Sequence, residues 1–214
     1  MDYIINSTFA IMKGFKVTYG LFFSTLLFSL PLGLIIALAR ISKSRLLQAT
    51  TGTYIWLLRG TPLLLQVFFI YFGLPAFGIR LENMPAAIVA FALNYAAYFA
   101  EIFRAGIQSI DRGQYESADV LGLSYSQTMK RIIIPQMVKR ILPPVSNEVI
   151  TLVKDTALVF GIGLTDVLRS AQIIVTRDFV ITAFLIAGVF YLLNTLILTL
   201  VFRKLEQRYA YYLG

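Results

Sequence analysis

Long apolar runs leave few folds open to this chain. The first extends from about Val17 to Ala39 and contains no charged side chain. At about 1.5 Å of rise per residue, a helix of this length crosses a hydrocarbon core about 30 Å thick. Four further runs cover about 53–72, 86–103, 145–164 and 179–202. The sequence therefore predicts an all-α integral membrane protein with five transmembrane helices.

The charged fraction supports this prediction. Only 14% of the 214 residues are charged, against about 25% in an ordinary soluble chain. No linker, repeat or low-complexity tract divides the sequence, so 1–214 is expected to form one membrane domain. The triplet Ala37-Leu38-Ala39 resembles a signal-peptidase site, which keeps cleavage as an alternative, but the first run exceeds the usual apolar region of a signal peptide.

The basic residues predict the orientation. Twelve lie after the first, third and fifth runs: Arg40, Lys43, Arg45, Arg104, Arg112, Lys130, Arg131, Lys139, Arg140, Arg203, Lys204 and Arg208. Five lie on the other side: Lys13, Lys16, Arg80, Arg169 and Arg177. The positive-inside rule then places the N-terminus outside and the C-terminus in the cytoplasm. In a chain this apolar, the net charge of +8 favours a lipid bilayer over nucleic acid as the partner.

The absence of histidine and cysteine narrows the chemistry. It excludes disulfides, thiol chemistry and histidine-ligated metals, and it removes the commonest general base. An enzyme is not excluded on this ground, but its commonest groups are missing, and we expect no catalytic residues, no metal site and no cofactor bound by this chain.

The second run is interrupted by Arg59-Gly60-Thr61-Pro62. Proline lacks an amide hydrogen and clashes with the preceding turn, so the helix is expected to bend or restart at Pro62. Arg59 either extends its side chain to the cytoplasmic interface or faces a cavity, and the interface is the preferred interpretation.

The fourth run carries charged residues that are costly in lipid. Glu148, Thr151 and Asp155 are spaced i, i+3 and i+7 and share one helical face. Two carboxylates on one face suit a cavity for a cationic solute. Lys154 lies off that face, where it could receive the carboxylate of a solute. The alternatives are a salt-bridge cluster with Lys154 or Arg59, and a proton relay.

A second polar face occurs in the third run. Asn94, Tyr98 and Glu101 are spaced i, i+4 and i+7. Asn94 and Tyr98 could hydrogen-bond a small polar solute, and Tyr98 could stack on a cationic group. Helix packing is an equally good explanation of Asn94 and Tyr98. Glu101 and Arg104, one turn apart, are expected to form a local ion pair.

A polar segment of about 109–135 separates the third and fourth runs and is predicted to be a cytoplasmic helix–turn–helix. Gly122 provides the turn and Ser124 is placed to cap a second helix. Ile132 and Pro135 are expected to mark the end of that helix. An amphipathic connector that only joins two spans is the alternative.

The spacing within this segment resembles the cytoplasmic coupling loop of ABC importer permeases, whose pattern is E-A-A-x3-G-x9-I-x-L-P. Glu116, Ala118 and Gly122 match it, whereas Ser117 replaces an alanine and Ile134 a leucine. Three more stretches resemble signatures of the polar amino-acid permeases of the histidine/glutamine/arginine type. They are 59–66 with 69–75, 94–98 with 101–107, and Lys154-Asp155-Thr156-Ala157-Leu158. The resemblance covers nearly the whole chain.

This resemblance implies a multi-pass subunit of the bacterial inner membrane that pairs with a second permease copy, identical or paralogous. A cytoplasmic ATPase dimer would receive the coupling loop through Glu116, Ser117, Ala118 and Gly122, and would bind the ATP and Mg²⁺. The chain has no Gly-rich Lys-Ser/Thr phosphate loop of its own. An extracellular or periplasmic binding protein would deliver the amino acid.

The solute is inferred from the residues rather than from the resemblance. Glu148 and Asp155 on one face favour a basic amino acid, namely arginine, lysine or histidine. Glutamine or another polar amino acid is the alternative within the transporter class. A passive channel and a non-transporting membrane scaffold are the alternatives from other classes.

Overall fold

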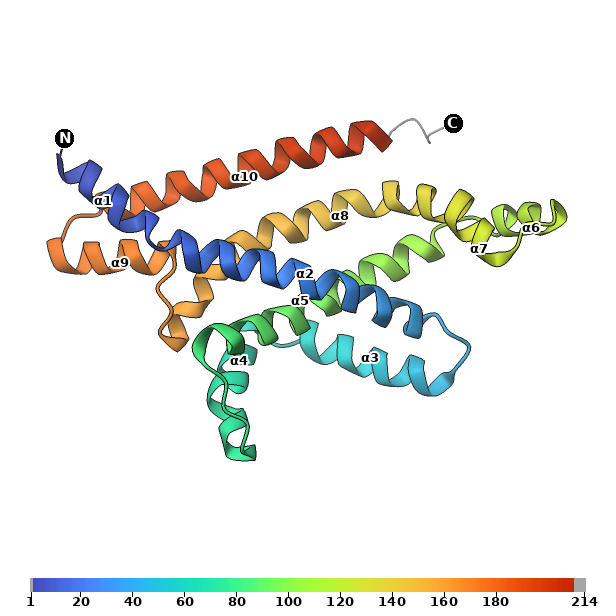
Figure 1. Cartoon of the computed structure of the whole chain (residues 1–214), viewed down its shortest axis with the longest axis horizontal. Coiled ribbons are helices and arrows are strands. Elements are labelled where there is room, and N and C mark those ends of the chain that lie inside the picture. The colour runs from blue at the N-terminus through green and yellow to red at the C-terminus, as the bar shows by residue number, and fades with distance from the viewer. Residues whose placement is uncertain (1, 210–214) are drawn as a thin grey trace.

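The computed structural model describes residues 2–209, and every regular element within them is helical. Four long helices run along the long axis of the molecule (Figure 1): α2 (Phe15–Arg40), α5 (Asn83–Gln108), α8 (Ile134–Asp155) and α10 (Thr182–Tyr209). The shorter α-helices are α1 (Asp2–Met12), α3 (Arg45–Arg59), α4 (Leu63–Phe68), α6 (Arg112–Val120), α7 (Tyr125–Thr128) and α9 (Val167–Asp178). The all-helical prediction is confirmed.

Three helical segments are long and apolar enough to cross a membrane: Asp2–Arg40, Asn83–Gln108 and Thr182–Tyr209. Two bent pairs pass the same test when each pair is taken together. The first joins Arg45–Arg59 to Leu63–Phe77 at 105°, and the second joins Tyr125–Ile162 to Val167–Asp178 at 57°. The described residues therefore hold three to five spans. The C-terminus itself, predicted to be cytoplasmic, lies outside the described residues.

Small residues hold the two central helices together. α2 buries the small residues Thr18, Thr25, Gly33 and Ala37 and makes its most extensive contacts with α5. A Cβ added at Gly33 would lie 2.8 Å from Cβ of Phe99 on α5. Lipid tails are as apolar as the side chains, so close backbone approach rather than the hydrophobic effect drives such helix pairs together. The α2–α5 pair forms the centre of the main core.

Residues 165–178 separate the fourth and fifth apolar runs, and their polar composition predicts a loop, which the structure corrects. Residues 167–178 form α9, which Asp166 caps by accepting hydrogen bonds from the backbone amides of Leu168 and Arg169 at 2.9 and 3.0 Å. Val167, Ala171 and Ile174 give α9 a buried face that packs with α1 and α10. These three residues are spaced i, i+4 and i+7 in a segment that also holds Arg, Ser, Gln, Thr and Asp, so the segment has a buried side but no long apolar run.

The predicted break in the second run is confirmed. α3 ends at Arg59, Pro62 precedes α4, and the two helices meet at 105°. The break leaves the carbonyl of Leu58 without its helical partner, and two amide side chains replace it. Gln66 Nε2 donates to Leu58 O at 2.8 Å and Asn94 Nδ2 at 3.0 Å. Asn94 also donates to Gln66 Oε1 at 2.9 Å, so α5 holds the broken helix in place.

Irregular helix follows the first bend and precedes the second. After α4 come a π-helical turn, Phe69–Gly73, and a 3₁₀ turn, Leu74–Phe77. After α8 comes a 3₁₀ segment, Thr156–Ile162. α4 meets the 3₁₀ segment after α8 where Phe68 packs on Gly161, because a Cβ on Gly161 would lie 2.5 Å from Cε1 of Phe68.

The polar segment between α5 and α8 partly follows its prediction. Gly122 turns the chain with φ of +69°, and Ser124 caps α7 in a reciprocal capping box with Gln127. The predicted end at Pro135 is wrong, since a π-helical turn, Met129–Ile133, carries the chain directly into α8. Pro135 lies in the first turn of α8, where a missing amide hydrogen breaks no hydrogen bond of that helix.

The hydrogen bonds at the α3–α4 break predict a stability effect for Asn94→Leu. The variant leaves Gln66 Oε1 without its donor and removes one of two donors to Leu58, at a cost of about 1–3 kcal/mol. We expect the thermal unfolding midpoint in detergent to fall by about 2–4 °C for each kcal/mol. The matched control is Thr53→Leu, because the Thr53 hydroxyl bonds only its own helix. An Asn94→Leu midpoint equal to that of the wild type would contradict this role.

Candidate functional site

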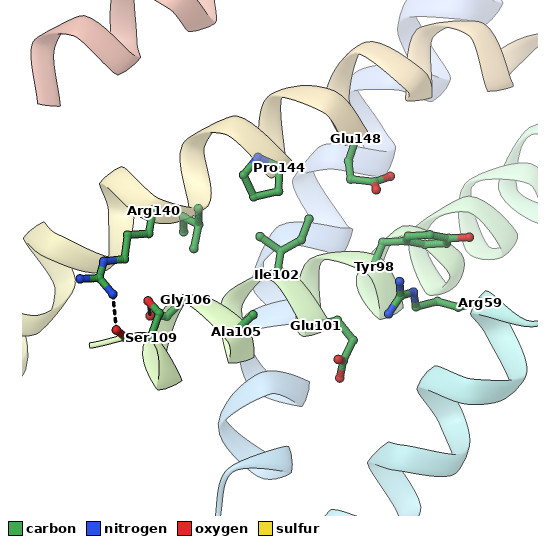
Figure 2. A pocket seen from close by; sticks show the side chains of 11 residues that line it. Arg59, Tyr98, Glu101, Ile102, Ala105, Gly106, Ser109, Arg140, Pro144 and Glu148 are labelled. Carbon is green, nitrogen blue, oxygen red and sulfur yellow. Dashed lines mark hydrogen bonds between the residues drawn. The ribbon is translucent and has the colours of Figure 1, made fainter. Parts of the chain in front are cut away.

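A pocket of about 480 Å³ lies between α5 and α8, close to the end of α3 (Figure 2). It is lined by Arg59, Tyr98, Glu101, Ile102, Ala105, Gly106, Ser109, Arg140, Ile141, Pro144 and Glu148. Ser109 and Arg140 belong to the end nearest the 109–135 segment. The pocket thus reaches from the α3–α4 break toward the polar end of the bundle.

A second pocket of about 330 Å³ shares Tyr98 and Glu148 with the first. It is lined in addition by Thr61, Pro62, Leu63, Asn94, Tyr95, Thr151 and Asp155. The predicted face of Glu148, Thr151 and Asp155 therefore lines one pocket, together with Asn94 and Tyr98. Because two residues belong to both pockets, we treat the pair as one site, which we call the break site.

Most charged groups of the break site already have partners within the chain. Glu101 forms an ion pair with Arg104 at 2.6 Å, as predicted, and Arg140 donates to the carbonyl of Ser109. Asp155 accepts a hydrogen bond from the buried Tyr95 hydroxyl at 2.8 Å. Neither Arg59 nor Lys154 forms an ion pair with Glu148 or Asp155 in the described part of the chain. The alternative of a salt-bridge cluster with Lys154 or Arg59 is therefore not formed among the described residues.

The structure places Arg59 in the pocket, against the preferred interpretation that it reaches the interface. Its guanidinium carbon lies 5.0 Å from the centre of the Tyr98 ring. In the view of Figure 2 this ring lies between the Arg59 guanidinium and the Glu148 carboxylate. The bend of 105° after Arg59 explains the difference, because it turns the end of α3 toward α5.

The remaining predicted residues differ in what they can offer a solute. Both Asn94 amide contacts go to the helix break, so its donors serve packing. Lys154 is exposed and lines neither pocket. Tyr95 was missed, although its position three residues before Tyr98 places it on the same side of α5.

The tip of the polar segment exposes apolar side chains. Val120, Leu121 and Tyr125 are 88%, 75% and 74% exposed around the Gly122 turn. We call these three residues the apolar tip. Glu116, Ser117 and Gly122 are also exposed, whereas Ala118 is fully buried within the chain. Ala118 therefore positions α6 and has no surface to offer a partner.

A hollow borders the apolar tip and carries acidic groups. It is lined by Tyr115, Glu116, Asp119, Leu123, Tyr125 and Thr128. Burial raises the pKa of the Tyr115 hydroxyl, with a further contribution from Tyr125, so this phenol stays neutral at ordinary pH. Residues 2–209 hold no group of three His, Cys, Asp or Glu side chains placed to bind a metal ion.

Comparisons with known proteins agree with this arrangement. The arginine transport system permease protein ArtQ of Bacillus subtilis is 40% identical over 92% of this chain and 91% of its own length. The L-cystine transport system permease protein TcyB of the same organism is 37% identical over 100% and 92%. A solved structure of an amino acid ABC transporter with histidines matches with a TM-score of 0.87 and 36% identity, covering 96% of this chain and 97% of that chain.

The family model described as "Binding-protein-dependent transport system inner membrane component" matches residues 29–211. The resemblance to amino-acid permeases is thereby confirmed over nearly the whole chain. This chain belongs to the family of binding-protein-dependent transport system inner membrane components, as a permease subunit of an amino-acid ABC importer.

Proposed function

We propose that this permease subunit carries basic amino acids and binds them at the break site. The observation that carries the proposal is the shared lining of Glu148, Thr151 and Asp155 in one pocket. Two carboxylates there lack ionic partners from the described residues. Charges inside a membrane protein are expensive unless they are matched, so a cationic solute is the expected partner.

A charge count favours a basic amino acid over a neutral one. Arg59, Arg140, Glu148 and Asp155 are the charged groups of the break site without an ionic partner. Arg140 is bound to the Ser109 carbonyl at the end nearest the 109–135 segment, which leaves one positive and two negative groups near the α3–α4 break. Lysine and arginine carry the opposite set, with one carboxylate and two cationic groups. Each charge of the solute then pairs with an opposite charge of the site. Arg59, rather than Lys154, binds the carboxylate of the solute. Glutamine has one cationic group and leaves one carboxylate unmatched.

The named relatives do not by themselves select a solute. Permeases named for arginine and for cystine resemble this chain at 40% and 37% identity. Glutamine or another polar amino acid therefore remains the alternative, and the binding experiment below decides between them. A passive channel or a non-transporting scaffold does not account for membership in a family of ABC transporter permeases.

The family implies two kinds of partner, an ATPase and a substrate-binding protein. We assign the ATPase contact to the apolar tip with Glu116, Ser117 and Gly122 around it. Exposed apolar side chains within a polar rim are typical of a protein interface core. We further propose that each bent pair forms one span, giving five spans with this tip on the cytoplasmic side and the N-terminus outside. A second permease copy, identical or paralogous, completes the membrane part.

ATP hydrolysis is assigned to the separate ATPase subunit, with no cofactor on this chain. The route from the tip to the break site is short in sequence and continuous in structure. α7, the π-helical turn and α8 form one helical path from Tyr125 to Glu148 and Asp155. α5 flanks this path, since a Cβ on Gly106 would lie 2.2 Å from Cγ2 of Ile141. A displacement at the tip would therefore reach both walls of the pocket.

The double variant Glu148→Gln/Asp155→Asn tests the solute proposal. Each lost charge-assisted contact is worth about 1.5–3 kcal/mol, so lysine and arginine affinity should fall about 100-fold or more. The measurement is equilibrium binding of labelled lysine, arginine and glutamine to the purified permease–ATPase complex. The control Asp2→Asn/Glu206→Gln removes the same charge from positions outside the break site. A wild type that prefers glutamine, or a double variant with unchanged lysine affinity, would refute basic specificity.

The variant Leu121→Asp tests the ATPase contact. A charge in the apolar tip must be desolvated on docking, so the complex with the ATPase should weaken at least tenfold, or by about 1.4 kcal/mol. Weaker association would be measured as reduced co-purification of the ATPase with the permease and as reduced solute-stimulated ATP hydrolysis. Gln207→Asp adds the same charge at an exposed position of α10 and serves as the control. Normal assembly of Leu121→Asp would place the contact elsewhere.

A further inference from the structure

We infer that Arg59 is a specificity-determining residue that makes the break site reject cations lacking a carboxylate. The inference rests on the proposed function, and it gives Arg59 a second role beside carboxylate binding. Its guanidinium takes the position on Tyr98 that a cationic group of the solute would use, and only a carboxylate draws it away. Arg59 thus competes with the cationic group of the solute for Tyr98 until a carboxylate of the solute pairs with the Arg59 guanidinium.

The contacts of Arg59 support an exchangeable position. The side chain is exposed and makes a cation–π contact with Tyr98, at 5.0 Å from the ring centre. Its positive charge also acts on the Glu101 and Glu148 carboxylates, without an ion pair to either. Figure 2 shows the guanidinium within the pocket, without a dashed hydrogen bond to another residue drawn there. Cation–π contacts at exposed sites are among the weaker ones in proteins. A solute carboxylate, which accepts two parallel hydrogen bonds from a guanidinium, is a stronger partner.

The neighbouring charges make the competition direct. Glu148 belongs to both pockets of the break site, and the positive charge of Arg59 acts on its carboxylate. A guanidinium or ammonium group from a solute is attracted to the same carboxylate and to the same aromatic ring. While Arg59 lies on Tyr98, a cation without a carboxylate binds with less favourable free energy. Arg59 partly neutralises the Glu148 charge and occupies the face of the Tyr98 ring.

A basic amino acid avoids this penalty. Its carboxylate pairs with Arg59 and moves the guanidinium off Tyr98, which frees the ring and Glu148 for the cationic end of the solute. The pairing of the carboxylate with Arg59 and the binding of the cationic end at Tyr98 and Glu148 therefore favour each other, because both require Arg59 to leave the ring. Polyamines and other cations that share the basic group but lack the carboxylate receive no such help. The site thereby selects amino acids over their decarboxylated forms.

The experiment compares arginine with agmatine, its decarboxylated form, on the intact permease–ATPase complex. The wild type should bind arginine at least tenfold more tightly than agmatine. In Arg59→Gln, arginine affinity should fall and agmatine affinity should rise about fivefold or more, so that the preference is lost. Arg59→Lys keeps a cation and should retain weak agmatine binding. Arg45→Gln, at the exposed start of the same helix, should behave as the wild type.

The gain in agmatine binding identifies the mechanism. A residue that only binds the carboxylate would lower arginine affinity and leave agmatine unchanged, and a residue that only supports the fold would weaken both. Adding Glu148→Gln to Arg59→Gln should abolish the gain, because the freed carboxylate is removed. Unchanged or weaker agmatine binding in Arg59→Gln overturns the inference. If the wild type binds no basic amino acid, the proposed function fails instead, whatever agmatine does.

Discussion

An interrupted helix must still satisfy the backbone groups that the break frees, and this constraint shapes the centre of the protein. The break between α3 and α4 frees the carbonyl of Leu58, and lipid offers no hydrogen-bond donor. Gln66 and Asn94 supply the donors, which fixes the broken helix against α5. The bend that results turns Arg59 toward Tyr98 and lets Thr61 and Pro62 line a pocket. The irregular backbone at the α3–α4 break thus packs against α5 and forms part of the wall of a polar cavity.

The same helices carry both ends of the proposed mechanism. α5 and α8 form the walls of the break site and continue to the 109–135 segment, where the apolar tip is exposed. Their close approach at Gly106 leaves little room for one helix to move without the other. Contact with the ATPase and contact with the solute are therefore properties of one pair of helices. The separate cluster of α1, α9 and α10 packs beside this pair.

Apolar runs and polar spacing predicted the long helices, the Pro62 break, the Gly122 turn and the shared face of Glu148 and Asp155, because each follows from local geometry. Predictions failed where tertiary contacts decide. α9 was missed because its buried face is only three apolar residues at helical spacing. The helix runs through Pro135 because a π-helical turn precedes it. The position of Arg59 depends on a bend of 105°, which sequence spacing does not specify. The same bend decides between the solute and packing roles that the spacing left open for Asn94.

The central claim is that the α3–α4 break creates the solute site of an amino-acid permease. The most direct measurement is an experimental structure of the permease–ATPase complex with lysine or arginine bound. The account predicts solute in the break site, with its carboxylate at Arg59 and its cationic groups at Glu148 and Asp155. Solute bound elsewhere, or bound there with its carboxylate away from Arg59 and its cationic groups away from both acidic residues, would contradict it.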